Sequence, residues 1–407
     1  MRALYTVLLR VALPFLVLRL WWRGRREPGY RESIPERFGI YRGERPGQLI
    51  WLHAVSVGEA RAAGPLARAL TGALPDHRIL ITCTTAAGRE TIKQVYGESA
   101  LTVFLPYDFP ETARAFLEYF RPRLAIVMET EVWPNLLAQC AAHGVPVVLA
   151  NARLSERSAR GYRRWRALAE PAFASLAAVC AQSVADAERL RSAGARHVEV
   201  TGNLKFDVTP DPAQVAAGAA WRRDLGRPVI LLASTREGEE SMLLAARPAD
   251  ARALLIVVPR HQRRFDEVAA MTDSRRSRQP MPGVGDRVHL GDSMGEMAFY
   301  YGASDVAIIG GSFAPLGGQN LIEALATGVP VVIGPHMYNF AEATELALQA
   351  GAALQVADAA AAMAAARDLL ANEEKRRRMA EAGRHLCSAH RGATARHLAT
   401  CRRLLRL

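Results

Sequence analysis

Carboxylates stand at two places in the sequence where a short apolar run gives way to a polar turn. Glu59 ends the segment His53-Ala-Val-Ser-Val-Gly-Glu59, and Glu129 and Glu131 lie between Met128 and Trp133. A carboxylate in the first turn of a helix can deprotonate a bound hydroxyl, yet acidic residues also favour that position because they stabilise the helix dipole. Glu59 is therefore a candidate general base, and helix capping stays open as the alternative.

The twin acids and a lysine offer further chemistry. Glu129 and Glu131 are two residues apart, so on an extended strand both side chains point to the same face and one pKa is expected to rise. A solvated strand end, followed by a helix from Pro134, is the alternative. Lys205, in Thr201-Gly-Asn-Leu-Lys-Phe-Asp207, can neutralise charge that develops on a phosphate or carboxylate, or it is an ordinary hinge lysine.

The second half of the chain carries four polar segments that also follow apolar runs. They are 234–240, which opens a helix and is a suitable place for an anion, 259–264, which places several cations at the mouth of the cleft, 291–296 and 310–323. The last segment contains two glycine pairs, which allow close approach of the backbone to a ligand, and Asn320 opens the next helix. Glu323 lies three residues later, where its carboxylate can accept hydrogen bonds from a ribose diol. A glycine-rich turn between a strand and a helix favours a nucleotide site.

Apolar runs that alternate with helix-period segments must position these residues. The runs are 49–56, 78–85, 101–106, 124–129, 145–150, 177–182 and 197–202, then 229–233, 253–259, 288–291, 306–310, 329–334 and 353–356. Several are apolar on both faces, which is typical of parallel strands covered by helices on both sides. The predicted class is α/β, with two doubly wound parallel-sheet (Rossmann-like) domains that face each other across a cleft, where ligands bind beyond the carboxyl ends of the strands.

The predicted boundaries divide the chain into five parts. They are an apolar N-terminal segment at 1–22, a first domain at 23–207, a turn-rich linker at 208–226, a second domain at 227–390 and a C-terminal helix at 391–407 that can pack back on the first domain. Helix-period segments lie between the apolar runs, for example at 60–74 and 110–120. The alanine-rich stretch 359–366 favours a helix, and 274–285 is expected to be a mobile polar loop.

The apolar segment from Ala3 to Trp22 has the length of a membrane span, about 20 residues. Arg10 would then lie near the bilayer centre, at a cost of about 2.5–3.5 kcal/mol. A spanning anchor and an in-plane amphipathic helix both remain open, whereas a cleaved signal peptide fits poorly because no small-residue cleavage site follows. Arg23 and Arg25 place the main body on the cytoplasmic side.

The overall composition is basic, with a formal net charge of +12 and a pI of about 9.9. Such a charge favours an anionic partner, which can be a phosphorylated substrate, acidic lipid or nucleic acid. RNA-binding aromatic motifs are missing from the sequence, which disfavours nucleic acid. The five cysteines show no metal-binding spacing, which indicates a reducing compartment and no structural zinc site.

Taken together, these segments resemble the Kdo (3-deoxy-D-manno-octulosonic acid) transferases, lipopolysaccharide-building glycosyltransferases of the GT-B fold. The resemblance covers nearly the whole chain and rests on HAVSVGE, LPYDFP, METEVWPN, ANARLSERS, GNLKFD, STREGEES, VPRH, GDSMGE, GGSF, GGQNLIEA and GPHMYNF in this order. It implies transfer of Kdo from CMP-Kdo to the lipid A precursor (lipid IVA), without a cofactor or metal and with inversion. It also implies an inner-membrane location, with the catalytic domains on the cytoplasmic face.

The same resemblance implies a role for individual residues. Glu59 would be the proton acceptor, and Glu129 and Lys205 would stabilise the transition state. The implied CMP-binding positions are Pro259, Arg260, Met294, Gly295, Glu296, Asn320, Leu321, Ile322 and Glu323. Gln319 stands where such enzymes commonly have histidine, and it receives no role because an amide does not titrate near neutral pH.

The implied partners are CMP-Kdo, the lipid A precursor and an anionic membrane surface, with no nucleic acid. An arginine cluster can contact lipid phosphates or be a solvated basic helix. Its members are Arg157, Arg160, Arg163, Arg164 and Arg166. The alternatives are another GT-B nucleotide-sugar transferase or epimerase that acts on an anionic membrane acceptor, and a membrane-associated protein that binds nucleic acid.

Overall fold

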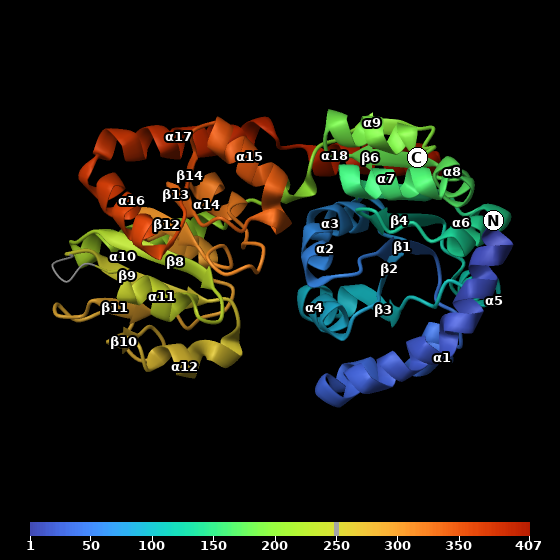
Figure 1. The fold of residues 1–407 in the computed structure, drawn as a ribbon, viewed down its shortest axis with the longest axis horizontal. Coiled ribbons are helices and arrows are strands. Elements are labelled where there is room, and N and C mark those ends of the chain that lie inside the picture. The colour runs from blue at the N-terminus through green and yellow to red at the C-terminus, as the bar shows by residue number, and fades with distance from the viewer. Residues whose placement is uncertain (248–251) are drawn as a thin grey trace. The chain divides into compact units, whose positions relative to one another are not determined.

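The computed structural model describes residues 1–247 and 252–407, which divide into two compact units (Figure 1). Unit 1 contains Met1–Asp207 and Arg391–Leu407, and unit 2 contains Val208–His390. The predicted linker 208–226 is largely helical, because Pro212–Leu225 form helix α10 of unit 2. Asp211, part of the turn-rich stretch 208–212, caps the start of α10, and Gly226 ends the helix in the left-handed conformation.

Unit 1 is built on a parallel seven-stranded sheet of order β3-β2-β1-β4-β5-β6-β7. Its strands are β1 (Leu49–His53), β2 (Arg78–Cys83), β3 (Ala100–Phe104), β4 (Leu124–Met128), β5 (Val147–Ala152), β6 (Ala178–Ala181) and β7 (Val198–Val200). Each strand falls within or overlaps a predicted apolar run. Both faces are covered: Leu49 and Trp51 pack into one apolar cluster, and Ile50 and Leu52 into another.

The helices of unit 1 follow the strands. They are α1 (Arg2–Arg26), α2 (Val57–Ala62), α3 (Gly64–Ala73), α4 (Ala86–Tyr96), α5 (Pro110–Phe120), α6 (Pro134–Ala142), α7 (Glu156–Arg164), α8 (Arg166–Ala174), α9 (Val184–Ser192) and α18 (Ala393–Leu405). The helix-period segment 60–74 is divided between two helices, because the chain breaks between α2 and α3. Pro65 lacks the N–H that a continuous helix would need at this point.

Unit 2 repeats the plan with a parallel sheet of order β10-β11-β9-β8-β12-β13-β14. Its strands are β8 (Val229–Thr235), β9 (Leu254–Pro259), β10 (Ser274–Arg275), β11 (Val288–Leu290), β12 (Val306–Ile309), β13 (Val331–Ile333) and β14 (Ala353–Gln355). Its other helices are α11 (Glu239–Ala245), α12 (Phe265–Ala269), α13 (Met297–Gly302), α14 (Ile322–Thr327), α15 (Ala341–Gln349), α16 (Ala359–Ala371) and α17 (Glu373–Ala389).

Strand β10 lies inside the segment predicted as a mobile loop, so that prediction was wrong at its first residues. Two polar residues give no apolar signal, and the strand exists because Ser274 and Arg275 pair with β11 at the sheet edge. The Arg275 guanidinium also contacts the buried Asp292 carboxylate at 2.6 Å, which fixes the end of β10.

Strand order determines where each unit can bind a ligand. In both sheets the order of strand addition reverses, between β1 and β4 in unit 1 and between β8 and β12 in unit 2. Doubly wound sheets bind ligands beyond the carboxyl ends of the strands at this reversal. The residues there are 54–59 and 129–131 in unit 1, and 236–240 and 310–314 in unit 2, which are four of the polar segments singled out above.

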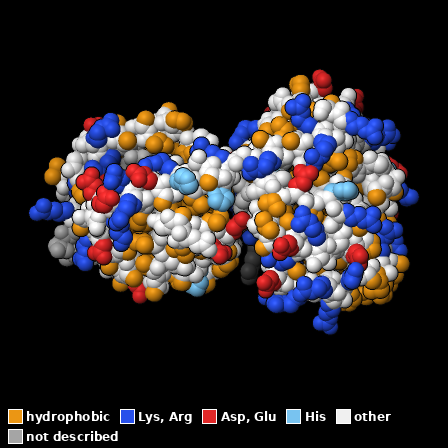
Figure 2. Space-filling model, turned by 90° about the horizontal axis from the view of Figure 1, so that it is seen from above, with side chains coloured by type: hydrophobic (Ala, Val, Ile, Leu, Met, Phe, Trp, Pro, Cys, Tyr) orange, Lys and Arg blue, Asp and Glu red, His pale blue; other side chains and the backbone are white. Residues whose placement is uncertain are grey.

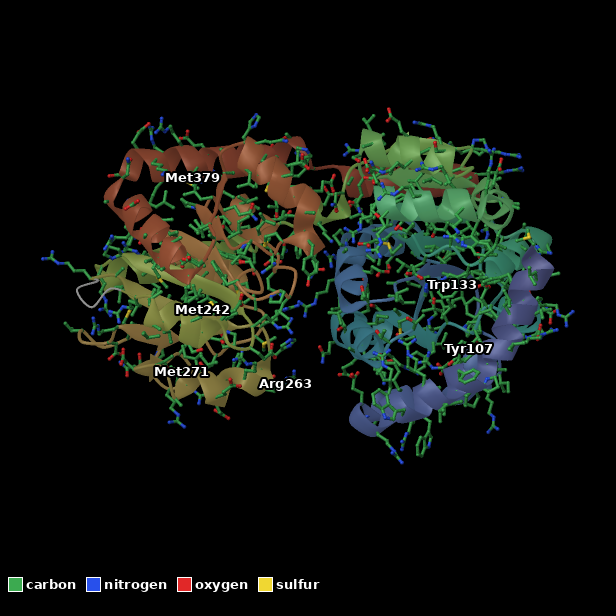
Figure 3. The ribbon with its side chains drawn as sticks, viewed as in Figure 1. Tyr107, Trp133, Met242, Arg263, Met271 and Met379 are labelled. Atoms are coloured by element: carbon green, nitrogen blue, oxygen red, sulfur yellow. The ribbon has the colours of Figure 1, made fainter. Side chains whose placement is uncertain are left out.

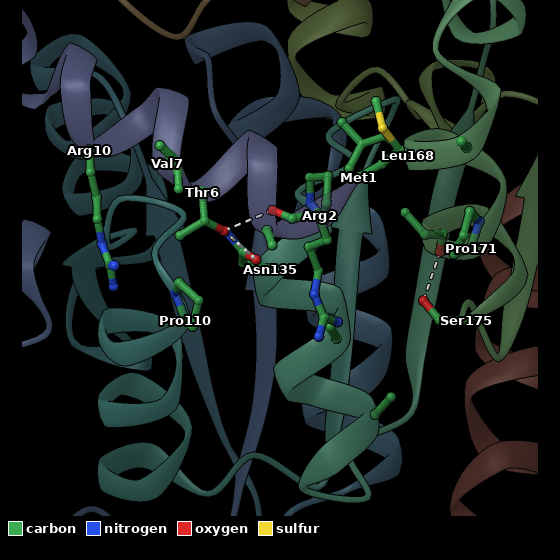
Figure 4. Close-up of a pocket in the computed structure, with 16 residues that line it drawn as sticks. Met1, Arg2, Thr6, Val7, Arg10, Pro110, Asn135, Leu168, Pro171 and Ser175 are labelled. Carbon is green, nitrogen blue, oxygen red and sulfur yellow. Dashed lines mark hydrogen bonds between the residues drawn. The ribbon is translucent and has the colours of Figure 1, made fainter.

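Helix α1 lies against the outside of unit 1, alongside α5 and α6 (Figure 1). The amide nitrogen of Asn135, at the start of α6, lies 2.9 Å from the Thr6 hydroxyl, a bond between two buried side chains that Figure 4 shows. Arg10 pairs with Glu111 of α5 at 3.1 Å, and Leu20 is buried. By length and composition α1 is apolar enough to cross a membrane, and only 11% of its most apolar window is buried.

Candidate active site

Glu59 lies in the first turn of α2, directly beyond the carboxyl end of β1. Its carboxylate accepts hydrogen bonds from the Val55 N–H at 2.9 Å and from the Ser56 hydroxyl at 2.8 Å. The Ser56 oxygen in turn accepts the Glu59 N–H at 3.3 Å, so the predicted capping interaction exists. Capping and proton transfer do not exclude each other, because each carboxylate oxygen can accept more than one bond.

Burial gives Glu59 the proton affinity of a base at neutral pH. Desolvation raises its pKa to about 7, although the bonds from Val55 and Ser56 oppose this shift. The charges of Glu129 and Glu131 raise the pKa further, which shows that the three carboxylates are close enough to interact. His53, in the same segment, is fully buried, and burial lowers its pKa to about 4, so it stays neutral and is unsuited to take up a proton.

Glu129 and Lys205, which were predicted separately, meet at the carboxyl end of β4. The Lys205 ammonium lies 4.0 Å from one Glu129 carboxylate oxygen, and the Arg153 guanidinium lies 3.2 Å from the other. About a fifth of each Glu129 and Lys205 side chain is exposed, so a ligand can reach the pair. Glu129 of this small ion-pair cluster lies within electrostatic range of Glu59, because its charge raises the Glu59 pKa.

The prediction that Glu129 and Glu131 share a strand face was wrong. Strand β4 ends at Met128, and Glu129 adopts a left-handed conformation with φ of 56°, so the alternation of an extended strand stops there. The left-handed turn sends the two side chains into different surroundings. Glu129 pairs with cations, whereas burial raises the pKa of Glu131 above its usual value.

A buried polar network positions Lys205, and sequence reasoning missed it. Asn151, at φ of 51°, accepts a bond at its carbonyl from the Gln182 amide at 2.8 Å. The Gln182 oxygen accepts from Asn203, whose own oxygen accepts the Lys205 N–H at 3.0 Å. His397 of α18 accepts the Asn151 N–H at 2.9 Å, and burial lowers its pKa to about 4, so it remains an acceptor. Lone Asn and Gln residues on separate strands gave no signal that they would meet.

In unit 2 the glycine-rich turn after β12 is held by a carboxylate of the chain itself. Glu239, the first residue of α11, is fully buried and accepts the backbone N–H groups of Gly311 at 2.5 Å and Phe313 at 2.9 Å. It also accepts the N–H of Arg236 at 2.9 Å. An N–H cluster of this kind binds anions, so Glu239 occupies the place where a phosphate was expected. Of the segment 234–240, where an anion site was predicted, the Arg236 N–H is taken by Glu239.

The cations predicted at 259–264 have separate roles. Arg264 is buried and pairs with Glu240 at 2.7 Å, so the expectation that it lines a ligand site was wrong. A guanidinium held by two carboxylates in the interior is a packing element. Arg263 beside α12 is exposed (Figure 3), whereas Arg260 stands directly after β9 and its N–H donates to the Thr235 carbonyl at 2.9 Å.

The remaining residues predicted to bind CMP follow β11 and β12. Met294 is exposed, and Gly295 is left-handed at φ of 81°. The Ser293 hydroxyl and the Arg276 guanidinium, which is 3.1 Å away, hold the pKa of Glu296 below its usual range. The Asn320 amide donates to Glu323 at 3.1 Å, which fixes the carboxylate at the start of α14. Among residues 1–247 and 252–407, no group of three or more metal-ligating side chains comes together.

Comparison with known proteins decides the family. Residues 32–208 match the family described as 3-deoxy-D-manno-octulosonic-acid transferase (kdotransferase), and residues 283–386 match glycosyl transferases group 1. The chain is 47% identical to the 3-deoxy-D-manno-octulosonic acid transferase of Bordetella pertussis, with 98% of each chain covered. It is 36% identical to that of Haemophilus influenzae, covering 98% of this chain and 97% of the relative. This chain belongs to the Kdo transferase family.

Solved structures agree on the fold of this Kdo transferase family member. A glycosyltransferase from Rickettsia africae superposes with a TM-score of 0.58 at 14% identity, covering 90% of this chain and 99% of that one. The UDP-GlcNAc 2-epimerase of Neisseria meningitidis gives 0.57 at 15% identity, covering 87% and 99%. At such identity only the fold is shared. The predicted α/β GT-B class with two parallel sheets is confirmed.

Proposed function

We propose that this chain transfers Kdo from CMP-Kdo to the lipid A precursor lipid IVA, with Glu59 as the general base. The observation that carries the proposal is the Glu59 carboxyl, which stands at the strand reversal of unit 1 with a pKa of about 7. A base with this pKa is deprotonated in part at neutral pH and still strong enough to take a hydroxyl proton. Family membership supplies the sugar.

The proposed reaction is a single displacement. Glu59 accepts the proton of the acceptor hydroxyl while the hydroxyl oxygen bonds to the anomeric carbon of Kdo. The bond from that carbon to the CMP phosphate oxygen breaks, and the electron pair leaves with CMP, so the configuration inverts. Lys205, oriented by Glu129, stabilises negative charge in the transition state, and no metal ion is required.

The donor is proposed to bind unit 2 through the strand-end residues. These are Pro259, Arg260, Met294, Gly295, Glu296, Asn320, Leu321, Ile322 and Glu323. Because Glu239 occupies the N–H groups of the glycine-rich turn, a cationic side chain such as Arg260 has to neutralise the CMP phosphate. Glu323, held by Asn320, is placed to accept bonds from the ribose.

The membrane is proposed to lie along α1, on the cytoplasmic face of the inner membrane. Thr6, Arg10 and Leu20 all contact unit 1, so α1 would have to leave these partners in order to span a bilayer. An in-plane position keeps the contacts and offers the exposed apolar side to lipid. Basic side chains spread over the visible face of each unit suit an anionic surface (Figure 2).

The direct test measures CMP release from CMP-Kdo with and without lipid IVA, together with the mass of the lipid product. We expect release to depend on the acceptor and the lipid mass to increase by one or more Kdo residues. Equal release without acceptor, or an unchanged lipid mass, would instead support a hydrolase, an epimerase or another nucleotide-sugar transferase.

A further inference from the structure

The outer face of α1 carries an unbroken apolar stripe. Its members recur at spacings of three and four residues and therefore lie on one side of the helix. They are Leu4, Leu8, Val11, Phe15, Leu18 and Trp22. Each is more than half exposed, from 51% for Leu4 to 73% for Phe15. A soluble surface rarely leaves so long an apolar patch uncovered, which indicates contact with lipid.

The stripe leads into a cavity of unit 1. The cavity has a volume of about 640 Å³ and lies between the start of α1, the 130–134 loop, α7 and α8. Leu4 and Leu8 belong both to the stripe and to the cavity wall, and Tyr162, Trp165 and Leu168 line the side formed by α7 and α8. An apolar chain that lies against the stripe can therefore continue into the cavity without crossing a polar barrier.

One wall of the cavity connects it to the candidate base. Glu131 and Trp133 line this wall, and Trp133 is labelled in Figure 3. Burial raises the pKa of Glu131, and the charge of Glu131 raises the pKa of Glu59. The inner wall of the cavity is thus within electrostatic reach of the carboxylate proposed to activate the acceptor.

Helix α7, which forms one wall of the cavity, carries positive charge on its other faces. Gly161 and Tyr162 of this helix line the cavity, while four exposed arginines occupy other positions of the same helix. They are Arg157, Arg160, Arg163 and Arg164. Guanidinium groups bind phosphate through paired hydrogen bonds, so an apolar cavity beside them matches a lipid with an anionic head and an acyl tail.

We propose that this cavity receives one acyl chain of an anionic lipid in the membrane, with the α7 arginines at its phosphate. The identification of that lipid as the acceptor rests on the proposed function, whereas the binding of the chain does not. The cavity would then select acylated acceptors and hold the sugar hydroxyl towards Glu59.

A glycine in the cavity wall allows a sharp test. Gly161 lines the cavity, and a Cβ added there meets no other heavy atom within 4 Å, so a side chain can start at this position without a clash and Gly161→Phe adds a ring at the cavity wall. Gly72, at an exposed position of α3, has the same open surroundings, so Gly72→Phe is the matched control. Both changes replace a helical glycine and should not weaken the fold.

The probe is phosphatidic acid that carries a diazirine at the end of one acyl chain, in phosphatidylcholine vesicles. After illumination, mass spectrometry locates the labelled peptides of the full chain. We expect wild type and Gly72→Phe to be labelled both on α1 and on the α7–α8 cavity wall. In Gly161→Phe the labelling of α1 should persist, whereas the yield of label on the cavity wall should fall about tenfold. An unlabelled cavity wall in wild type, or equal labelling in Gly161→Phe, would overturn the proposal. Equal labelling by a diazirine phosphatidylcholine would overturn its anionic selectivity.

Kinetics separate this proposal from the proposed function. With lipid IVA, Gly161→Phe should raise the KM for the acceptor about tenfold and leave the KM for CMP-Kdo unchanged. An unchanged KM for the acceptor would refute the acyl-chain site in the cavity and leave the proposed transfer reaction intact. Absence of transfer in wild type would refute the proposed function, and lipid labelling would still decide the cavity.

Discussion

Two glutamates at equivalent places in the two units have opposite surroundings. Glu59 and Glu239 each lie in the first turn of a helix beside the strand reversal of their sheet. Glu239 is fully buried and accepts backbone N–H groups of Arg236, Gly311 and Phe313. Glu59 is only partly buried and has two donors, the Val55 N–H and the Ser56 hydroxyl.

The comparison shows what turns a helix-opening carboxylate into a base. Several N–H donors hold the Glu239 carboxylate in place, where it shapes the glycine-rich turn. Glu59 has fewer donors to offset its desolvation, so its pKa rises to about 7 and the carboxylate can exchange a proton. Position in the fold is the same, and the number of donors decides the role.

The largest expected effect comes from removing the base. Glu59→Gln keeps the shape of the side chain and can still accept a bond from the Val55 N–H, but it cannot accept a proton. We expect transfer to fall about 10²–10⁴-fold, with CMP binding and the melting temperature retained, as steady-state assays and calorimetry would show. Glu188→Gln, at an exposed position of α9, is the control. Turnover near that of wild type in Glu59→Gln would remove Glu59 from the mechanism.

The second change breaks the other side of the comparison. Glu239→Gln puts an amide NH₂ where a carboxylate oxygen faces buried N–H groups. We expect the free energy of unfolding to fall by about 1–3 kcal/mol for each donor left without an acceptor, and CMP affinity to fall with it. Urea unfolding and CMP titration measure both. Exposed Glu381→Gln on α17 is the control. A stable variant with full CMP affinity would show that Glu239 does not hold the turn.

The two cations beside Glu129 allow a finer test. Lys205→Met removes the ammonium proposed to stabilise the transition state. Arg153→Met removes the other cation that pairs with Glu129, and the Arg153 side chain is 47% exposed. We expect kcat to fall about 10–100-fold for Lys205→Met and clearly less for Arg153→Met. Equal losses in the two variants would mean that both act only by neutralising Glu129.

The smallest effect sharpens the account of the Glu59 pKa. The Ser56 hydroxyl bond lowers this pKa, so Ser56→Ala should move the pH profile of transfer upwards from about 7. Loss of the helix cap should cost about 1 kcal/mol of stability. Ser183→Ala removes a similar cap, with Asp186, from α9 and should cost the same stability without moving the profile. A profile unchanged in Ser56→Ala would contradict the role of this bond.

Much of this fold could be predicted from the sequence because parallel strands are apolar throughout. The apolar run that forms β4 could be predicted as a strand for this reason, whereas the two polar residues of β10 gave no strand signal. The places of Glu59, Glu129 and Lys205 after apolar runs could be read from the sequence, whereas their grouping was implied only by the family resemblance. The left-handed turn at Glu129 and the burial of Arg264 depend on neighbours distant in sequence, which no local pattern reveals.

The central claim is that Glu59 acts as a base because burial raises its pKa. The pH dependence of kcat/KM for transfer to lipid IVA tests this most directly, since it reports the ionisation of the free enzyme. A carboxyl whose pKa is raised is inactive as a base below that value, so we expect activity to rise with pH through about 7 and then level off. In Glu59→Gln the residual activity should lose this step. A wild-type profile that stays flat from about pH 5 to 8, above the usual pKa of a glutamate, would contradict the account.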